Sequence, residues 1–154
     1  MIVGLGVDIV EIKRLREILA RQQDRFIQRV FTESEQEYCR SHRDPVPHYA
    51  ARFAAKESLF KALGTGWAKG VSWRDAEVVR EAMRAPILVL HGQAEKLSES
   101  LGVDAVHLSL THSNESAVAV VILEHQGHLE SPLKPFEGGT RPSRFRTLPG
   151  DGYL

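Results

Sequence analysis

The segment of residues 52–63, RFAAKESLFKAL, constrains the fold more than any other part of the chain. On a helix of 3.6 residues per turn, its Phe and Leu side chains cover about a third of the circumference. Arg52 and Lys56 fall inside that apolar arc, Glu57 lies at its edge, and Lys61 follows one turn beyond Glu57. Charges on the packed side of a helix are costly unless they are paired or bound to an ion. The segment therefore predicts a long helix, over about 47–63, that enters the core and carries a polar site.

Two interpretations of these charges remain open from the pattern alone. Glu57 and Lys61 can form an ordinary pair on a helix surface, worth a few tenths of a kcal/mol. Alternatively, the helix supplies a carboxylate, which magnesium prefers, together with Arg52 and Lys56, because arginine and lysine bind phosphates.

Asp8 is a second candidate, because it interrupts an aliphatic strand over residues 2–10. It can cap the helix that follows, or it can be a second oxygen ligand for a metal bound by Glu57. His112 stands at the end of a strand, after Ser109-Leu110-Thr111, where it is either structural or a general base, phosphate donor or ligand. Gly64-Thr65-Gly66 ends the long helix, as glycines often do, or lets backbone N–H groups approach phosphate oxygens.

Four arginines, one of them Arg14, make a basic face near the N-terminus. Such a face is usually a solvated charge stripe, and the alternative is a docking surface for an acidic protein. The four residues are Arg14, Arg21, Arg25 and Arg29.

The remaining elements follow from hydrophobic periodicity and from glycine and proline positions. Helices are predicted at 11–23, at 33–43 with Thr32 or Ser34 as its cap, and at 92–101, ending at Gly102. Strands are predicted at about 75–82, 86–91, 106–110 and 117–123, with Asn114-Glu115 making a hairpin turn between the last two. Residues 126–154 are rich in proline and glycine and predict a tail.

The composition excludes several classes of protein. A chain of 154 residues suits one domain, and 20 basic against 20 acidic residues argue against a general nucleic-acid binder. Cys39 is the only cysteine, so no internal disulfide is possible, and it is expected to be a structural thiol. The N-terminus lacks the basic start of a signal peptide and no apolar run approaches the ~20 residues of a membrane span, so the chain is expected in the cytoplasm with no membrane partner.

Four segments together resemble one family, the holo-(acyl-carrier-protein) synthases, which are short single-domain phosphopantetheinyl transferases. They are Gly6-Val7-Asp8-Ile9-Val10-Glu11-Ile12, Phe31-Thr32-Glu33 with Glu35 and Tyr38, residues 52–57 followed by Lys61-Ala62 and Gly64-Thr65-Gly66, and Ser109-Leu110-Thr111-His112. The resemblance covers residues 1–124 in the expected order, while residues 125–154 exceed the usual family length. It implies a transferase domain over 1–124 and a Pro/Gly-rich C-terminal tail over 125–154.

The resemblance implies an α+β fold, with an antiparallel sheet packed against a long helix. It also implies transfer of the 4′-phosphopantetheine group from coenzyme A to a serine of apo acyl carrier protein, a step in fatty acid biosynthesis that releases adenosine 3′,5′-bisphosphate. Family members of this length form homotrimers, with active sites between neighbouring subunits.

The same resemblance implies roles for individual residues. Asp8 and Glu57 match the magnesium ligands and, with Lys61 near the phosphates, form the catalytic set. The residues that match the family's coenzyme A site are Arg52, Lys61, Gly64, Thr65, Gly66 and His112. Arg14 matches the basic residue that contacts the carrier protein, with Arg21, Arg25 and Arg29 beside it.

Two other functions fit parts of the pattern. A metal-dependent phosphohydrolase would use Asp8, Glu57 and Lys61 without needing the basic face. A non-enzymatic module for an acidic protein would need the arginines but not carboxylates at packed positions.

Overall fold

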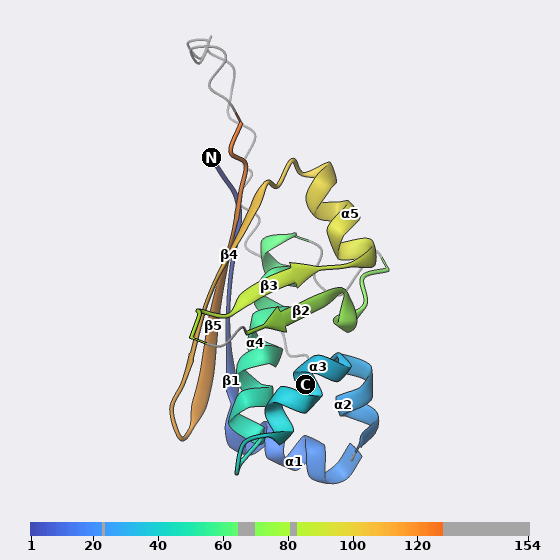
Figure 1. Cartoon of the computed structure of the whole chain (residues 1–154), viewed down its shortest axis with the longest axis vertical. Helices are drawn as coiled ribbons and strands as arrows, with labels where there is room; N and C mark the ends of the chain where they lie inside the picture. The colour runs from blue at the N-terminus through green and yellow to red at the C-terminus, as the bar shows by residue number, and fades with distance from the viewer. Residues whose placement is uncertain (23, 65–69, 81–82, 128–154) are drawn as a thin grey trace.

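The computed structural model describes residues 1–22, 24–64, 70–80 and 83–127. The described elements are β1 (Ile2–Glu11), α1 (Ile12–Gln22), α2 (Asp24–Val30), α3 (Glu33–Arg40), α4 (Val46–Ala62), the 3₁₀ turn η1 (Trp73–Asp75), β2 (Ala76–Val79), β3 (Ile87–Leu90), α5 (Gly92–Ser100), β4 (Ala105–His112) and β5 (Ser116–Glu124). This is the predicted α+β arrangement (Figure 1).

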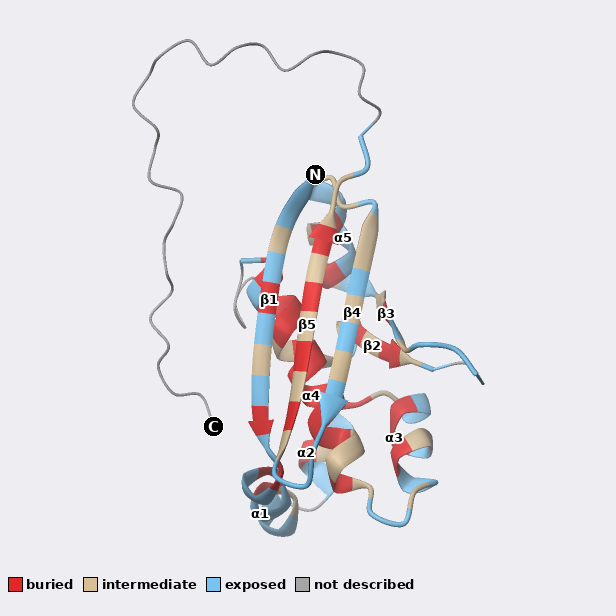
Figure 2. Ribbon diagram, turned by 90° about the vertical axis from the view of Figure 1, so that its left-hand side faces the viewer, coloured by how far each residue is buried: buried red, intermediate tan, exposed pale blue. Residues whose placement is uncertain are grey.

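The main sheet has three antiparallel strands in the order β1-β5-β4, and β2 and β3 form a separate hairpin. Asp8 of β1 lies opposite Ala119 of β5, and Leu110 of β4 lies opposite the same residue. The strands β4 and β5 form the predicted hairpin across residues 113–115. One face of the sheet packs against α4, while the other faces outward (Figure 2).

Glycines allow α4 to pack directly on β1. A Cβ atom at Gly4 or Gly6 would collide with the carbonyl oxygens of Ala62 and Ser58 on α4. Ser58 is buried and its hydroxyl donates to the carbonyl of Ala119 on β5, 3.0 Å away. This close approach brings the polar end of α4 to the middle of β1.

The first predicted helix is confirmed, because a helix was expected over 11–23 and α1 spans Ile12–Gln22. The helix that follows it was not predicted: α2 begins at Asp24 and buries Phe26 and Val30. The capping prediction for the next helix is confirmed, because Thr32 is the N-cap of α3 in a reciprocal capping box with Glu35. Gly102, at the end of α5, has the positive φ of 69° that favours glycine.

Candidate active site

Asp8 and Lys61 meet where α4 crosses β1. The Lys61 ammonium lies 2.8 Å from Asp8 Oδ1 and also donates to the carbonyl of Val7, at 3.1 Å. Among the described residues, no hydrogen bond joins Asp8 to α1, so the carboxylate binds a charged side chain instead of capping that helix. Since Lys61 turns to Asp8, no ion pair within 4.0 Å joins it to Glu57 in the described part of the chain.

Glu57 lies one turn before Lys61 on α4 and is partly buried. Burial, reinforced by the negative charge of Asp8, raises the pKa of Glu57 to about 7. Burial also raises the pKa of Asp8, although the hydrogen bond and charge of Lys61 oppose this shift. Among the described residues, the ion pair of Asp8 with Lys61 is the one ion pair that either carboxyl group makes, so the site is short of positive charge.

This donor set fits a magnesium ion. Magnesium is usually held by one or two carboxylates, with water and substrate phosphates completing its coordination. The described residues contain no cluster of three or more His, Cys, Asp or Glu side chains of the kind that holds zinc. Asp8 and Glu57 are thus suited to a magnesium ion that shares its coordination with a phosphate substrate.

A second polar cluster lies on the other flank of α4, around Arg52. The Arg52 guanidinium carbon lies 3.9 Å from the ring centre of Tyr38 on α3, and the residue is 4% exposed. Its Nε has no hydrogen-bond partner among the described residues, and none of their carboxylates pairs with it. A buried cation that lacks an anionic partner is a candidate site for an anionic ligand.

His112 belongs to this same cluster. Its ring lies 5.3 Å from that of His48 on α4, and the ring of His42 lies 3.6 Å from His48. Sequence reasoning singled out Arg52 and His112 but did not place the other two histidines beside them. The signal was present in the four-residue spacing of Tyr38 with His42 and of His48 with Arg52.

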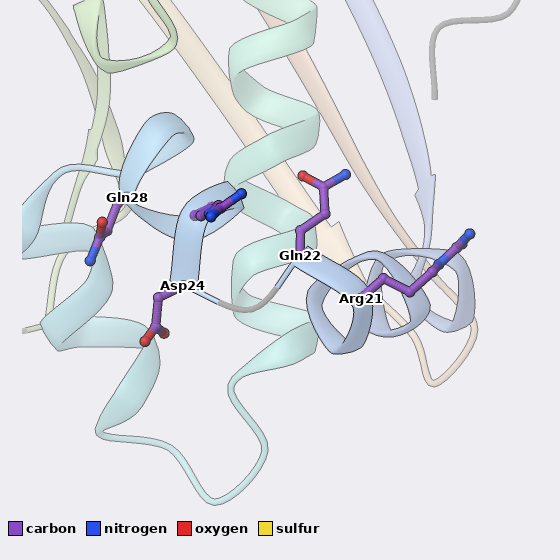
Figure 3. Close-up of a pocket in the computed structure, with 5 residues that line it drawn as sticks. Arg21, Gln22, Asp24 and Gln28 are labelled. Carbon is purple, nitrogen blue, oxygen red and sulfur yellow. The ribbon is translucent and has the colours of Figure 1, made fainter.

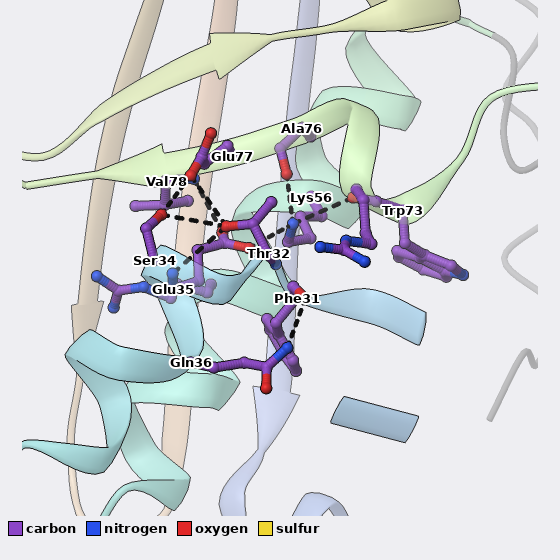
Figure 4. A network of polar contacts seen from close by, with 12 residues as sticks. Phe31, Thr32, Ser34, Glu35, Gln36, Lys56, Trp73, Ala76, Glu77 and Val78 are labelled. Carbon is purple, nitrogen blue, oxygen red and sulfur yellow. Dashed lines mark hydrogen bonds and ion pairs between the residues drawn. The ribbon is translucent and has the colours of Figure 1, made fainter. Parts of the chain in front are cut away.

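Lys56 belongs to neither cluster, although it shares the packed side of α4. Its ammonium lies 2.8 Å from Glu35 Oε2, with both side chains fully buried, and it donates to the carbonyls of Trp73 and Ala76 (Figure 4). The second oxygen of Glu35 accepts from the backbone of Val78, at 2.9 Å. Lys56 therefore joins α4 to α3 and β2, and it is not a phosphate ligand.

The four arginines of the predicted basic face are exposed, with Arg14 and Arg21 on α1 and the other two on α2. A polar pocket of about 560 Å³ lies where the helices meet (Figure 3). It is lined by Arg21, Gln22, Asp24, Arg25 and Gln28. The face therefore spans two helices and includes an acid.

Of the predicted glycine turn Gly64-Thr65-Gly66, the structure describes only Gly64. Gly64 follows α4 with a φ of 67°, as expected for a helix end. Thr65 and Gly66 lie outside the described residues. Cys39 is buried, and burial raises its pKa to about 12, which agrees with a structural thiol.

Comparison with known proteins places this geometry in a class. The model of the 4′-phosphopantetheinyl transferase superfamily matches residues 4–121. A holo-[acyl-carrier-protein] synthase of Geobacter sp. (strain M21) is 51% identical over 124 residues, covering 80% of this chain and 99% of the relative. That of Koribacter versatilis is 48% identical over 124 residues, with the same coverage of both chains.

A solved structure gives the same result. The holo-(acyl-carrier-protein) synthase of Bacillus anthracis, in complex with CoA (3′,5′-ADP), superimposes with a TM-score of 0.67 at 38% identity, covering 81% of this chain and 98% of that one. The chain belongs to the 4′-phosphopantetheinyl transferase superfamily and, within it, to the holo-[acyl-carrier-protein] synthases.

Proposed function

We propose that this chain transfers the 4′-phosphopantetheine group of coenzyme A to a serine of apo acyl carrier protein, giving holo carrier protein and adenosine 3′,5′-bisphosphate. The observation that carries the proposal is the contact of Lys61 with Asp8 beside the partly buried Glu57, in a chain of this family. Two carboxylates and one ammonium suit the positioning and charge neutralisation that phosphoryl transfer requires.

Asp8 and Glu57 would hold a magnesium ion together with pyrophosphate oxygens of coenzyme A. When bound, the ion offsets negative charge that develops on those oxygens. Burial raises the pKa of both carboxyl groups, and a bound cation would favour their charged forms.

The reaction forms a bond between the serine oxygen and the β-phosphorus, while the bond from that phosphorus to the bridging oxygen breaks. Glu57 would accept the serine proton. Lys61 would stabilise the negative charge that the departing nucleotide phosphate gains. No covalent enzyme intermediate is needed, and the buried Cys39 is not involved.

The nucleotide would lie against the Arg52 cluster. The unpartnered Nε of Arg52 offers a buried donor to an anion, and His112 lies at the same cluster. Gly64, Thr65 and Gly66 complete the proposed set, since backbone N–H groups in a glycine turn can approach phosphate oxygens.

The group of Asp8, Glu57 and Lys61 and the cluster around Arg52 lie on opposite flanks of α4. Arg52 and Lys61 are nine residues apart, which on a helix is a rotation of about half a turn. Asp8 lies on β1 and His112 on β4, and these strands are the two edges of the main sheet. One coenzyme A molecule would reach both halves most simply if each belonged to a different copy of the chain.

A homotrimer with shared sites is part of the proposal, and an apolar face of the main sheet supports an interface between subunits. The outward face of β1 exposes more than half of each of three apolar side chains, Leu5, Val7 and Ile9. They lie opposite Ile122, Val120 and Val118 of β5, so the apolar surface continues across the sheet. Such a continuous apolar face suits burial between subunits.

The carrier protein would dock on the exposed arginines of α1 and α2, because opposite charges steer association. We place the reaction in the cytoplasm, where free coenzyme A and apo carrier protein meet. No helix among the described residues is long and apolar enough to cross a bilayer.

The direct test is the mass of an apo acyl carrier protein after incubation with the chain, magnesium and coenzyme A. A gain of one phosphopantetheine group that requires all three components supports the proposal. Release of adenosine 3′,5′-bisphosphate without carrier would identify a phosphohydrolase instead. An unchanged carrier that still binds the chain would identify a non-enzymatic binding module.

A further inference from the structure

His42 and His48 stack against each other beside Arg52. Their ring centroids are 3.6 Å apart with an angle of 31° between the planes, and the ring of His112 adjoins His48. His42 comes from the turn after α3, His48 from the first turns of α4, and His112 from the end of β4. Three separate elements therefore bring their imidazoles to one place.

The hydrogen bonds of His42 show where a proton can be added. Its Nδ1 lies 2.9 Å from the backbone carbonyl oxygen of Tyr38, which can only accept a hydrogen bond. Nδ1 therefore carries a hydrogen, and in the neutral ring Nε2 has the free lone pair. A proton added to this ring goes to Nε2, which then becomes a donor.

The groups that face the stacked pair are mostly basic. Arg52 on α4 and His112 on β4 both adjoin His48 and disfavour its charged form, as does His42. Burial is the largest cause of the low pKa of His48, which falls to about 4. The ring is therefore neutral near pH 7 while no anion is bound.

Few acidic groups face His48. Asp44, in the turn before α4, is the one carboxylate among the described residues that opposes the shift of His48, and its own oxygen lies 2.7 Å from Arg16. Arg80, just after β2, brings a further positive charge close to this cluster, because its guanidinium donates to the Tyr38 hydroxyl at 3.2 Å. An anion placed here would meet cations on several sides and would reverse the field on His48.

We propose that the stacked pair of His42 and His48 takes up a proton when the phosphomonoester group of coenzyme A binds beside Arg52. This inference rests on the proposed function. The pyrophosphate of coenzyme A must lie at Asp8, Glu57 and Lys61 for transfer to occur, which leaves the phosphomonoester for the second cluster. A phosphomonoester carries nearly two negative charges at pH 7, whereas each pyrophosphate phosphorus carries one, so it favours protonation of an adjacent imidazole most strongly.

The pair holds one added proton more readily than two, because two charged rings at this distance repel each other. Binding then gains up to about tenfold in affinity per unit fall in pH where a full proton is taken up. The pair makes affinity for the intact coenzyme, and for the product that keeps the same phosphate, dependent on pH.

Titration calorimetry of the full chain with magnesium at pH 7, in buffers of different ionisation enthalpy, measures the proton uptake directly. The probes are coenzyme A and 3′-dephospho-coenzyme A, which differ only in the phosphomonoester. We expect coenzyme A to bring in roughly half to one proton more than the dephospho form, while any proton that Glu57 releases is common to both probes. Equal uptake with the two probes would overturn the proposal, and this comparison requires no variant.

Two variants locate the proton. His48→Gln and His42→Gln remove one ring each, and either should at least halve the uptake and flatten the rise in affinity between pH 8 and pH 6. His91→Gln is the control, because His91 pairs with Glu77 at 2.8 Å outside the cluster, and it should keep the wild-type uptake. Unchanged uptake in the double variant His42→Gln/His48→Gln would place the proton elsewhere and refute the assignment.

The transfer assay separates this inference from the function on which it rests. A chain that modifies the carrier and binds coenzyme A without proton uptake keeps its function and loses the inference. A chain that neither modifies the carrier nor binds coenzyme A fails the proposed function itself.

Discussion

Lys56 Nζ lies 2.8 Å from Glu35 Oε2, and neither side chain is exposed to solvent. Glu35 also closes the capping box of α3 by accepting from the N–H of Thr32, at 2.9 Å. The pair therefore connects the start of α3 to the centre of α4, next to Glu57. Breaking such a pair is costly because the remaining charge stays buried.

The variant Lys56→Met should lower the free energy of unfolding by about 3–5 kcal/mol, as measured by urea denaturation. Adding Glu35→Gln should recover part of this loss, because the buried negative charge is then removed as well. Lys96→Met on α5 is the matched control and should cost no more than about 0.5 kcal/mol, because Lys96 is exposed. A small loss for Lys56→Met, similar to that of the control, would contradict the structural role.

Glu57 should make the metal-free protein less stable as the pH rises. Its folded pKa of about 7 exceeds the ordinary value of 4.5, so the folded chain holds a proton between these pH values that the unfolded chain has lost. The cost is therefore absent below about pH 4.5 and complete above about pH 7. Water reaches the partly exposed side chain, so we expect Glu57→Gln to stabilise by only about 1–2 kcal/mol at pH 8, and not at pH 4.

Thermal unfolding of both proteins without metal, at pH 4 and pH 8, measures this difference. Adding magnesium at pH 8 should stabilise the wild type and have little effect on Glu57→Gln, because the variant lacks one of the two ligands. Glu99→Gln, which changes an exposed carboxylate on α5, is the control. A gain of equal size at both pH values would show that burial of charge is not its cause.

Asp8→Ala should reduce transfer to the carrier by more than tenfold at saturating magnesium, a loss above about 1.4 kcal/mol in the barrier. The substitution removes one of two carboxylates and leaves Lys61 without its ion-pair partner. Asp104→Ala, at the far end of the sheet, should retain activity. Retention of more than a tenth of the wild-type rate by Asp8→Ala would refute the metal assignment.

The elements that carry a local pattern were the ones that could be predicted from sequence. The apolar arc of residues 52–63 predicted α4, and alternation predicted β4 and β5. The end of the first helix near residue 23 was predicted, whereas α2 was not, because its seven residues bury only Phe26 and Val30 and are too few to show a clear helical period. The predicted strand over 75–82 began one residue early, because Asp75 belongs to the 3₁₀ turn that Ser72 caps. β2 ends at Val79, and residues 81 and 82 lie outside the described residues.

The polar side chains of α4 show the same limit for the site. Asp8 could be singled out because it interrupts an aliphatic strand. Glu57 and Lys61 could be singled out because Glu57 lies at the edge of the apolar arc and Lys61 follows one turn beyond it. The partner of Lys56 could not, because Glu35 lies 21 residues away and only the packing of α3 on α4 brings them together. The approach of His42 to His48 depends on that packing too.

Arg14→Glu should weaken binding of the apo carrier protein while leaving coenzyme A affinity unchanged. Arg14 is exposed on α1, at the opposite end of the molecule from α5 (Figure 1). Charge reversal converts attraction for an acidic partner into repulsion, and salt screens both over ~8–10 Å. The difference in carrier affinity between Arg14→Glu and wild type should therefore shrink as salt rises from about 50 to about 500 mM, because salt screens exposed charges.

Surface plasmon resonance with immobilised carrier gives this comparison, with Lys96→Glu as the control for a charge reversal on α5. An equal loss of affinity for coenzyme A would assign Arg14 to the nucleotide site instead.

Removal of residues 128–154 should leave catalysis intact. These residues lie beyond the segment that matches the family, and their proline and glycine content gives them little apolar surface to offset the entropy of ordering. The cut must follow Gly127, because His125 and Gln126 still bind the domain. The N–H of His125 donates to the Met1 carbonyl, 2.8 Å away, and that of Gln126 to Asp104 Oδ2, 2.7 Å away.

A second truncation after Glu124 tests this boundary, since it removes both hydrogen bonds and the contact of the N-terminal ammonium with the His125 carbonyl. It should lower the free energy of unfolding by about 1–3 kcal/mol relative to the truncation after Gly127. Light scattering and turnover should be the same for the full chain and for the chain that ends at Gly127. If the chain that ends at Gly127 were monomeric and inactive, the tail would instead join subunits, through residues such as Phe136 or Phe145. The tail would then help to complete the shared site.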